Sequence, residues 1–214
     1  MNDVAPYPFD DDLPLATRAD RVPRWRLYVP PGPMVVLGYG SRVDREIFAD
    51  RCAGDEVPVY RRRGGGCAVV LDPGVLVAAA AIPVDGILGT KAHFNRLTDW
   101  LADGLARTGV AGIRKDGIFD LTCGGRKIAG GSTHRTHEVL FWTASVLVVP
   151  PVALMERYLR HPPREPAYRA HRDHGGFVTG VAAAGGPADA PALRDALRPA
   201  LEPIGCWSPL PGQS

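Results

Sequence analysis

Proline is distributed very unevenly along this chain. Residues 1–33 hold seven prolines and residues 150–214 hold eleven, whereas the 116 residues between them hold only three. Because proline interrupts both helices and the hydrogen-bond ladders of sheets, we expect the regular core to lie within 34–149. The two ends should form mostly extended segments, turns and loops. We therefore predict three parts: a proline-rich N-terminal segment (1–33), a core (34–160), and a Pro/Gly-rich C-terminal segment (161–214) whose short helix packs on the core.

Hydrophobic patterns within the core predict several strands and one long helix. The helix should run from Thr90 to about Arg107, since apolar residues recur there at helical spacing and Gly109 follows. Ser41 is expected to cap a second helix over 42–53. Further elements are strands at 34–39, 57–61, 68–72, 75–82, 118–122, 126–128 and 139–149, and helices at 151–159 and 192–201.

The spacing of these elements also indicates a fold class. The strands at 68–72 and 75–82 are separated only by Pro73 and Gly74, so we expect them to form a hairpin. Strands at hairpin spacing around one long helix favour an α+β fold with a mixed, mainly antiparallel sheet flanked by helices.

Composition places the chain among ordinary globular proteins. Its 214 residues suit one domain, and 45% of them are hydrophobic and 22% charged. No apolar run is long enough to cross a membrane, and the acidic N-terminus lacks the apolar stretch of a secretory signal. A net charge of +2 is too small to indicate a nucleic-acid groove. We therefore expect a cytoplasmic protein with reduced cysteines and with no nucleic-acid or membrane partner.

The first segment that could carry chemistry is RRRGGG at 61–66, which cannot be regular structure. Backbone amides of consecutive glycines can point at an anion, and neighbouring arginines can bind carboxylate or phosphate through paired hydrogen bonds. A surface hairpin with a basic rim is the alternative interpretation.

The second segment surrounds Lys127, which stands between the pairs Gly124–Gly125 and Gly130–Gly131. Only three of the 25 basic residues are lysine, so a lysine at this position is notable. A compact ammonium suits a charge that develops on a carboxylate or an α-phosphate better than a planar guanidinium does. A glycine-rich turn with a solvated lysine is the alternative.

Other residues give weaker signals. The H-x-x-H spacings of His134/His137 and His171/His174 lack the carboxylate of a zinc signature such as H-E-x-x-H, so we predict no metal site from them. Cys123 would be a nucleophile only with a depressed pKa, and a small apolar strand residue is the simpler interpretation.

In this order and at this separation, the two glycine-rich segments resemble the lipoate–protein ligase branch of the biotin/lipoate/octanoate attachment family. That branch carries R-R-x-x-G-G-G-A-V followed by D-x-G, then N-D-L, then G-x-K-x-x-G. The matching residues are Arg61, Arg62, Gly65, Gly66, Ala68, Val69, Asp72, Gly74, Asp120, Leu121, Gly125, Lys127 and Gly130.

The resemblance implies a fold, a reaction and a set of site residues. The fold is the catalytic domain shared with biotin ligases, here without the accessory C-terminal domain of larger ligases. The reaction activates lipoate or octanoate with ATP and Mg²⁺ as an acyl-adenylate. It then transfers the acyl group to a lysine on a lipoyl-carrier domain, of the glycine-cleavage H protein or 2-oxoacid dehydrogenase type. Lys127 would be the catalytic lysine. The residues expected to bind substrate or adenylate are Arg61, Arg62, Gly64, Gly65, Gly66, Ala68, Asp120, Gly125 and Gly130.

The same resemblance predicts how these segments meet. We expect an apolar tunnel bordered by the 61–69 loop and the 124–131 turn, since the neighbouring strand at 75–82 is rich in alanine and valine. Arg61 or Arg62 should face the anionic group of the ligand. Only one of the two should point inward, because side chains alternate in direction along a strand. Arg63 should be more peripheral, since the family match covers only the first two arginines.

Two alternatives stay open at this point. Octanoyltransferases resemble this fold and use a cysteine nucleophile placed well after the family lysine, but only Cys206 follows Lys127 here. The chain could also be a non-catalytic binding subunit of a two-chain ligase. The sequence FWTAS at 141–145 favours this reading, because the family usually has His-His-Gly-Thr there. Either form of ligase could require a separate accessory subunit.

Overall fold

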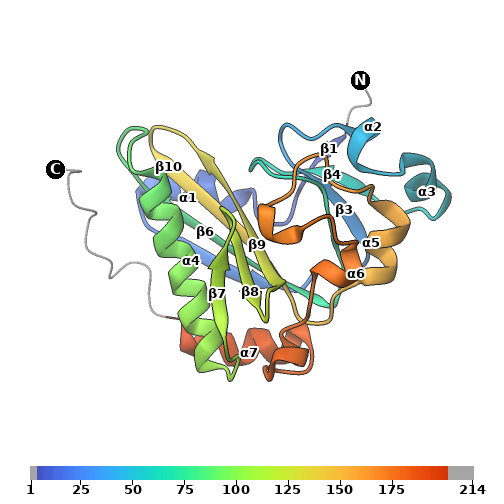
Figure 1. The fold of residues 1–214 in the computed structure, drawn as a ribbon. Helices are drawn as coiled ribbons and strands as arrows, with labels where there is room; N and C mark the ends of the chain where they lie inside the picture. The colour runs from blue at the N-terminus through green and yellow to red at the C-terminus, as the bar shows by residue number, and fades with distance from the viewer. Residues whose placement is uncertain (1–3, 202–214) are drawn as a thin grey trace.

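The computed structural model describes residues 4–201, and its strands form two sheets that lie beside each other (Figure 1). The larger sheet is antiparallel throughout. Its strands, in spatial order, are β2 (Arg24–Tyr28), β6 (Val75–Pro83), β10 (Val139–Leu147), β9 (Arg126–Arg135), β8 (Asp120–Cys123) and β7 (Ile113–Asp116). The smaller sheet is mixed, with strand order β1 (Ala5–Pro6), β4 (Val59–Arg61), β3 (Met34–Leu37) and β5 (Val69–Leu71). The expected α+β class is therefore confirmed.

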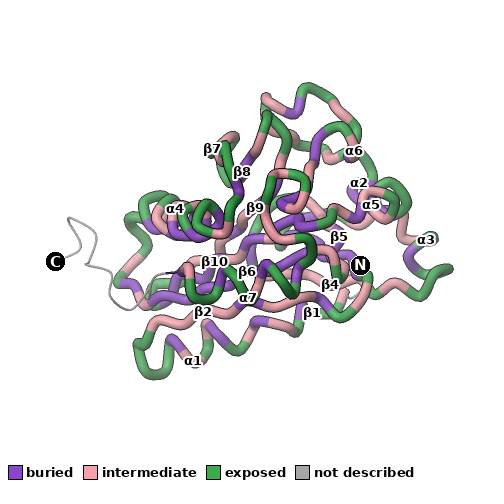
Figure 2. Tube along the Cα trace, turned by 90° about the horizontal axis from the view of Figure 1, so that it is seen from below, coloured by how far each residue is buried: buried purple, intermediate pink, exposed green. Residues whose placement is uncertain are grey.

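Helices cover both faces of the larger sheet and the outer side of the smaller one. Figures 1 and 2 show α1 and α4 on opposite faces of β2, β6 and β10, with α2, α3 and α5 around the smaller sheet. The helices are α1 (Asp12–Asp20), α2 (Val43–Glu46), α3 (Ala49–Gly54), α4 (Thr90–Arg107), α5 (Val152–Tyr158), α6 (His174–Phe177) and α7 (Ala190–Ala200), with 3₁₀ turns η1 (Ala167–Arg169) and η2 (Ala182–Ala184).

Strand β6 is an inner strand of the larger sheet, between β2 and β10, and its composition explains why helices can approach both faces. Its residues 75–82 are all buried. Ala78 and Ala80 pack in the core that α4 and α7 share, whereas Ala79 and Ala81 pack toward α1. A strand buried on both faces has no polar alternation, so the run VLVAAAAI reads as continuously apolar.

The long helix is confirmed with the predicted bounds. Leu97, Leu101 and Leu105 of α4 lie in the core. At Gly104, an added Cβ would lie 2.8 Å from a methyl of Leu197, so the glycine allows α7 to pack closely on α4. The predicted C-terminal helix on the core is thus also present.

The expectation that the regular core begins at residue 34, after an N-terminal segment of mostly extended chain, turns and loops, is wrong. Helix α1 and strand β2 both lie in the proline-rich N-terminal segment, and β2 pairs with β6. Helix α1 holds Pro14 in its first turn, where no intrahelical donor is lost, and β2 contains no proline and lies at a sheet edge.

The predicted hairpin across Pro73 and Gly74 is also wrong. Strand β5 pairs with β3, whereas β6 pairs with β2 and β10, so the turn carries the chain from one sheet into the other. The turn is fixed on the end of β10, because the carbonyl of Gly74 accepts hydrogen bonds from the amides of Val148 and Val149. Both edges of β6 are therefore paired, one with β2 and the other with β10, and none is left for β5.

The predicted helix over 42–53 is divided into α2 and α3. Ile47 adopts an extended backbone between them and forms a bridge with Leu159, and the amide of Phe48 donates to the carbonyl of Tyr158. Ser41 does not cap the helix, because its side chain is engaged elsewhere, as described below.

The remaining differences concern one additional strand and the ends of two others. Strand β7 was not expected, β8 begins at Asp120 rather than 118, and β9 continues through Gly130 and Gly131 to Arg135. Pairing with β10 along its length holds β9 extended, although its glycines give no strand signal. Within residues 4–201, no helix combines the length and apolar character needed to cross a bilayer.

Candidate active site

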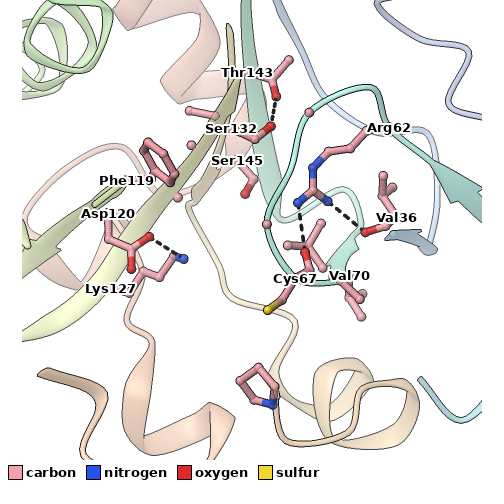
Figure 3. Close-up of a pocket in the computed structure, with 18 of the residues that line it drawn as sticks. Val36, Arg62, Cys67, Val70, Phe119, Asp120, Lys127, Ser132, Thr143 and Ser145 are labelled. Atoms are coloured by element: carbon pink, nitrogen blue, oxygen red, sulfur yellow. Dashed lines mark hydrogen bonds and ion pairs between the residues drawn. The ribbon is translucent and has the colours of Figure 1, made fainter. Parts of the chain in front are cut away.

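Both glycine-rich segments line one cavity, which has a volume of about 620 Å³. Figure 3 shows Arg62 reaching toward it from one side and Lys127 with Asp120 from the other. Of the residues predicted to act here, those on the cavity wall are Arg62, Gly64, Gly66, Ala68, Asp120, Lys127 and Gly130. Arg61, Gly65 and Gly125 do not line it. The apolar walls include Val70, Val77 and Leu147, as the predicted tunnel requires.

The two arginines at the start of the loop hold its backbone in place. Arg61 donates from Nη1 to the carbonyl oxygens of Gly38 and Ser41, both at 2.9 Å. Arg62 donates to the carbonyls of Val36 (3.1 Å) and Cys67 (3.0 Å), thereby joining β3 to the loop. Hence the first arginine serves the fold, and the second combines a structural role with a position on the cavity.

Arg62 also differs from Arg63 in the groups that accept its hydrogen bonds. Its burial lowers the pKa of the guanidinium, and its acceptors are neutral carbonyls rather than carboxylates. By contrast, Arg63 pairs with Asp11 at 2.8 Å, away from the cavity. A cation held among neutral acceptors beside an apolar cavity can attract the carboxylate of a ligand.

Glu46 anchors the same loop, and no sequence signal singled it out. This buried carboxylate lies 2.9 Å from the hydroxyl of Ser41 and accepts from the amide of Ala68 at 2.7 Å. The hydroxyl of Ser41 also lies 3.1 Å from the carbonyl of Gly66. The side chain expected to cap a helix therefore positions the glycine-rich loop instead.

The glycines of this loop should differ sharply in their tolerance of a side chain. A Cβ at Gly64 would lie 2.5 Å from Oγ of Ser132, whereas a Cβ at Gly65 would meet nothing within 4 Å. We expect Gly64→Ala to lower the free energy of unfolding by about 1–3 kcal/mol through overpacking. Gly65→Ala should leave it unchanged or raise it by up to about 1 kcal/mol. Urea unfolding of both variants measures this, and equal losses in the two would contradict the loop geometry.

Lys127 lies in a network of polar and aromatic groups on the opposite wall. Its Nζ is 2.7 Å from Oδ1 of Asp120, and the hydroxyl of Tyr168 donates to Oδ2 of the same carboxylate at 2.8 Å. The lysine side chain is 25% exposed and the aspartate side chain 11%. Burial and the neighbouring Asp120 carboxylate raise the pKa of Tyr168, which keeps it a hydrogen-bond donor. The carboxylate is thus fixed from one side and holds the ammonium from the other.

The chain around Lys127 is positioned by main-chain pairing. Gly124 and Gly125 form the two-residue turn between β8 and β9, both with positive φ (57° and 70°). This is the conformation of a type I′ hairpin turn, which favours glycine. The role of Gly125 in the structure is therefore the turn, whereas Gly130 lies beside the ammonium.

Gly130 offers a direct test of the ammonium's position. A Cβ built there would lie 2.4 Å from Nζ and 2.6 Å from Cε of Lys127, so Gly130→Ala must displace the flexible end of the lysine. We expect acyl transfer to fall about 10- to 100-fold while the fold is kept, since a displacement of about 1 Å can cost this much. Gly40→Ala, which meets nothing within 4 Å, is the control. Transfer at the wild-type rate in Gly130→Ala would show that this ammonium position is irrelevant.

Two polar side chains at the 160–178 side of the cavity were missed by the sequence analysis. Arg169 is 4% exposed and His174 is 9% exposed, and both line the cavity. Among the described residues, Nη2 of Arg169 and Nε2 of His174 have no hydrogen-bond partner. Desolvation lowers the pKa of both groups. Unsatisfied buried polar atoms that face a cavity are suited to a polar ligand.

The weaker sequence signals are resolved as follows. His174 lines the cavity and His171 is exposed, so their H-x-x-H spacing does not bring them to a common site. His134 lines the cavity and His137 is exposed. Cys123 does not line the cavity. Cys206 lies outside the described residues.

A model of the lipoyl protein ligase A/B catalytic domain matches residues 10–201. The chain belongs to this family. The match spans nearly the whole described chain and includes α1 and β2 of the N-terminal segment.

Individual relatives within the family differ in their reactions. The chain is similar to octanoyltransferase LipM of Moorella thermoacetica, with 27% identity over 146 residues, 59% of this chain and 54% of that protein. It is also similar to a candidate lipoate-protein ligase A of Aeropyrum pernix, with 34% identity over 107 residues, 50% of this chain and 39% of that one. The matched part spans about half or less of each of these relatives.

Solved structures share the fold at low identity. The chain of a bi-partite lipoate protein ligase from Thermoplasma acidophilum has a TM-score of 0.74 at 20% identity, covering 92% of this chain and 80% of that one. A lipoate-protein ligase A bound with ATP has a TM-score of 0.68 at 21% identity, covering 88% and 76%. These likenesses establish the fold. The family match confirms the expected membership in the lipoylation family of protein-modifying ligases and transferases.

Proposed function

We propose that this chain activates lipoate or octanoate as an acyl-adenylate and transfers the acyl group to a carrier lysine. In the first step a carboxylate oxygen attacks the α-phosphorus of ATP, and pyrophosphate leaves. In the second step the lysine ε-amine attacks the acyl carbonyl carbon. An amide bond forms, the bond to AMP breaks, and the amine loses a proton.

One observation carries the proposal: Arg62 and Lys127 reach one apolar-walled cavity from opposite sides. A volume of about 620 Å³ is in the usual range for small-molecule sites, and the apolar walls suit a medium-length acyl chain. Two cations at the cavity suit the charge of its carboxylate or adenylate.

We assign each cation a role from its surroundings. Arg62, fixed by backbone carbonyls, would orient the carboxylate of the free acid. Lys127 would stabilise the negative charge that develops on the acyl oxygen and the phosphate as the amine attacks. Asp120 would hold the ammonium in place and Tyr168 would hold Asp120. Arg169, with Nη2 unpartnered in the described chain, would bind the phosphate. Mg²⁺ would enter with ATP.

The proposed carrier is a lipoyl domain. The Thermoplasma relative is described as a bi-partite ligase together with its E2 lipoyl domain. By analogy, we propose a lipoyl-carrier domain as the acceptor, and a separate accessory subunit as a second requirement of this chain.

Acyl transfer from a carrier-protein thioester is the second candidate, and Cys67 is the observation that favours it. This thiol lines the cavity, and the relative from Moorella is an octanoyltransferase. However, burial raises the pKa of Cys67, which lowers its thiolate fraction and makes it a poorer nucleophile. We therefore place the ligase reaction first.

The test incubates the full chain with an apo lipoyl domain and follows carrier mass by mass spectrometry. One arm supplies octanoate or lipoate with ATP and Mg²⁺, a second supplies synthetic lipoyl-adenylate, and a third supplies octanoyl-acyl carrier protein without ATP. The ligase proposal expects modification in the first two arms. Modification in the third arm alone, abolished in Cys67→Ser, would replace it with the transferase. Modification in none, with or without candidate accessory chains, would favour a binding subunit.

A further inference from the structure

Three side chains between α5 and α6 converge beside the cavity, away from Lys127. His161 Nε2 lies 2.9 Å from Oε2 of Glu165, and His171 Nδ1 lies 2.7 Å from Oε1 of the same carboxylate. One ligand atom from each of the three lies within 4.8 Å of the others. Among the described residues, this is the one group of three or more His, Cys, Asp or Glu side chains gathered so closely.

The ligand atoms indicate which ion such a group would bind. Two imidazole nitrogens and one carboxylate oxygen suit first-row transition ions such as Zn²⁺, Co²⁺ and Ni²⁺. Mg²⁺ and Ca²⁺ prefer sites made of oxygen alone. Three protein ligands leave at least one position for water, and the His171 side chain is 91% exposed, so an ion can arrive directly from solvent.

The arrangement is held by more than the two imidazoles. Glu165 also accepts from the amide of His171 at 3.1 Å and lies 3.4 Å from Nε of buried Arg169. Its side chain is only 15% exposed, so the carboxylate has a fixed position. Ion pairs between this carboxylate and exposed histidines contribute little to the stability of the fold by themselves.

The backbone also brings His171 to this position at a conformational cost. Ala170 and His171 both have left-handed φ values, of 49° and 58°, which non-glycine residues rarely adopt. Two successive residues of this kind turn the chain after η1, and the imidazole of His171 thereby faces Glu165. Strain of this kind, together with converging ligands, suits a pre-organised site.

We propose that His161, Glu165 and His171 form a binding site for a divalent transition-metal ion of the Zn²⁺ class. The ion would join the two ends of the 161–171 segment through its middle residue. Because Glu165 and Arg169 line the cavity, metal binding would also stabilise this wall. The proposal concerns a site separate from Lys127 and does not depend on the acyl-transfer reaction.

The site is tested on the tag-free full chain by titration with Zn²⁺ in a calorimeter and with Co²⁺ in a spectrophotometer. We expect one ion per chain and the visible absorption of Co²⁺ bound with nitrogen and oxygen ligands. His161→Ala and His171→Ala should each weaken binding by at least about 100-fold, the upper end of what loss of an outer-sphere partner costs. His137→Ala removes an exposed histidine elsewhere and should bind the ion as wild type does.

A second readout follows the segment itself. Arg164 is exposed within it, so trypsin cleavage after Arg164 should slow on adding Zn²⁺ to wild type but not to His171→Ala. Circular dichroism and thermal unfolding without metal show that the variants fold. The proposal is overturned if wild type shows no saturable one-to-one binding. It is equally overturned if His161→Ala and His171→Ala both retain the wild-type affinity.

Discussion

Lys127→Ala should lose about 100- to 1,000-fold in the rate of acyl transfer from synthetic lipoyl-adenylate to an apo lipoyl domain. This corresponds to roughly 3–4 kcal/mol, the usual effect of removing one electrostatic contact to a transition state. The reason is geometric: the ammonium lies 2.7 Å from Asp120, beside Gly130 on the cavity wall, where a developing negative charge can meet it. The measurement is the single-turnover rate at saturating adenylate.

The fold should be nearly unaffected by this change. The ion pair with Asp120 is partly exposed and Tyr168 still donates to the carboxylate, so we expect a loss of stability below about 1 kcal/mol. Lys115→Ala is the matched control, because Lys115 pairs with Asp99 at 2.6 Å on an exposed surface. It removes an equivalent lysine–aspartate pair and should transfer at the wild-type rate.

Lys127→Arg should not restore activity. A planar guanidinium is larger than an ammonium and directs its donors in a fixed fork. The ammonium lies so close to Gly130 that a Cβ added there would be only 2.4 Å from Nζ, so there is little room for a larger group. If Lys127→Ala kept more than about a third of the wild-type rate, a loss under about 0.7 kcal/mol, the catalytic assignment would be wrong.

Trp142→Ala should have the largest effect on stability, a loss of about 3–5 kcal/mol in the free energy of unfolding. Trp142 is 1% exposed in the centre of β10. Its ring packs edge-on against Trp100 of α4 at 6.3 Å between centroids, and Trp100 packs in the same way on Trp25 of β2 at 5.8 Å. Replacing Trp142 with alanine removes one of the two sheet residues that pack on Trp100, and it leaves a cavity between the sheet and α4.

Trp142→Phe separates the contribution of aromatic packing to stability from that of the indole N–H group. Nε1 of Trp142 has no hydrogen-bond partner among the described residues, so phenylalanine removes a buried unsatisfied donor while it keeps an aromatic ring. We expect a loss of about 1–2 kcal/mol, smaller than that of alanine. Chemical unfolding followed by circular dichroism checks both variants. A loss below about 1 kcal/mol for Trp142→Ala would contradict a core built around this residue.

The position of Trp142 also explains a departure from the family pattern. The strand at 139–147 alternates, so Trp142 enters the core shared with α4, while Phe141, Thr143 and Ser145 line the cavity. Of the side chains that stand in place of the family's usual polar residues, Trp142 packs in the core and the others named here line the cavity. The hydroxyl of Thr143 lies 3.0 Å from that of Ser132 on β9, which keeps this wall polar.

The sequence by itself determined the local elements and the family. Helix α4 follows from its apolar spacing and its terminal glycine, and β6 and β10 follow from long apolar runs. These signals are local, because a helix or strand buries a face that its own residues define. The ordered motifs around Arg62 and Lys127 likewise identified the family and the two segments that share the cavity. The catalytic role of Lys127 stays a prediction.

Only the tertiary structure decided how distant segments combine. The division of strands at Pro73 and Gly74 depends on the other strands that pair with β6, and no nearby residue encodes them. Glu46 became an anchor of the glycine-rich loop because α2 carries it next to Ala68. His174 reaches the cavity from a segment that is joined to β9 by a bridge between Val178 and Lys127, where the amide of Thr179 donates to the carbonyl of Lys127. In each case the decisive contact joins residues far apart in the chain, and such contacts leave no periodicity or spacing that a local pattern can reveal.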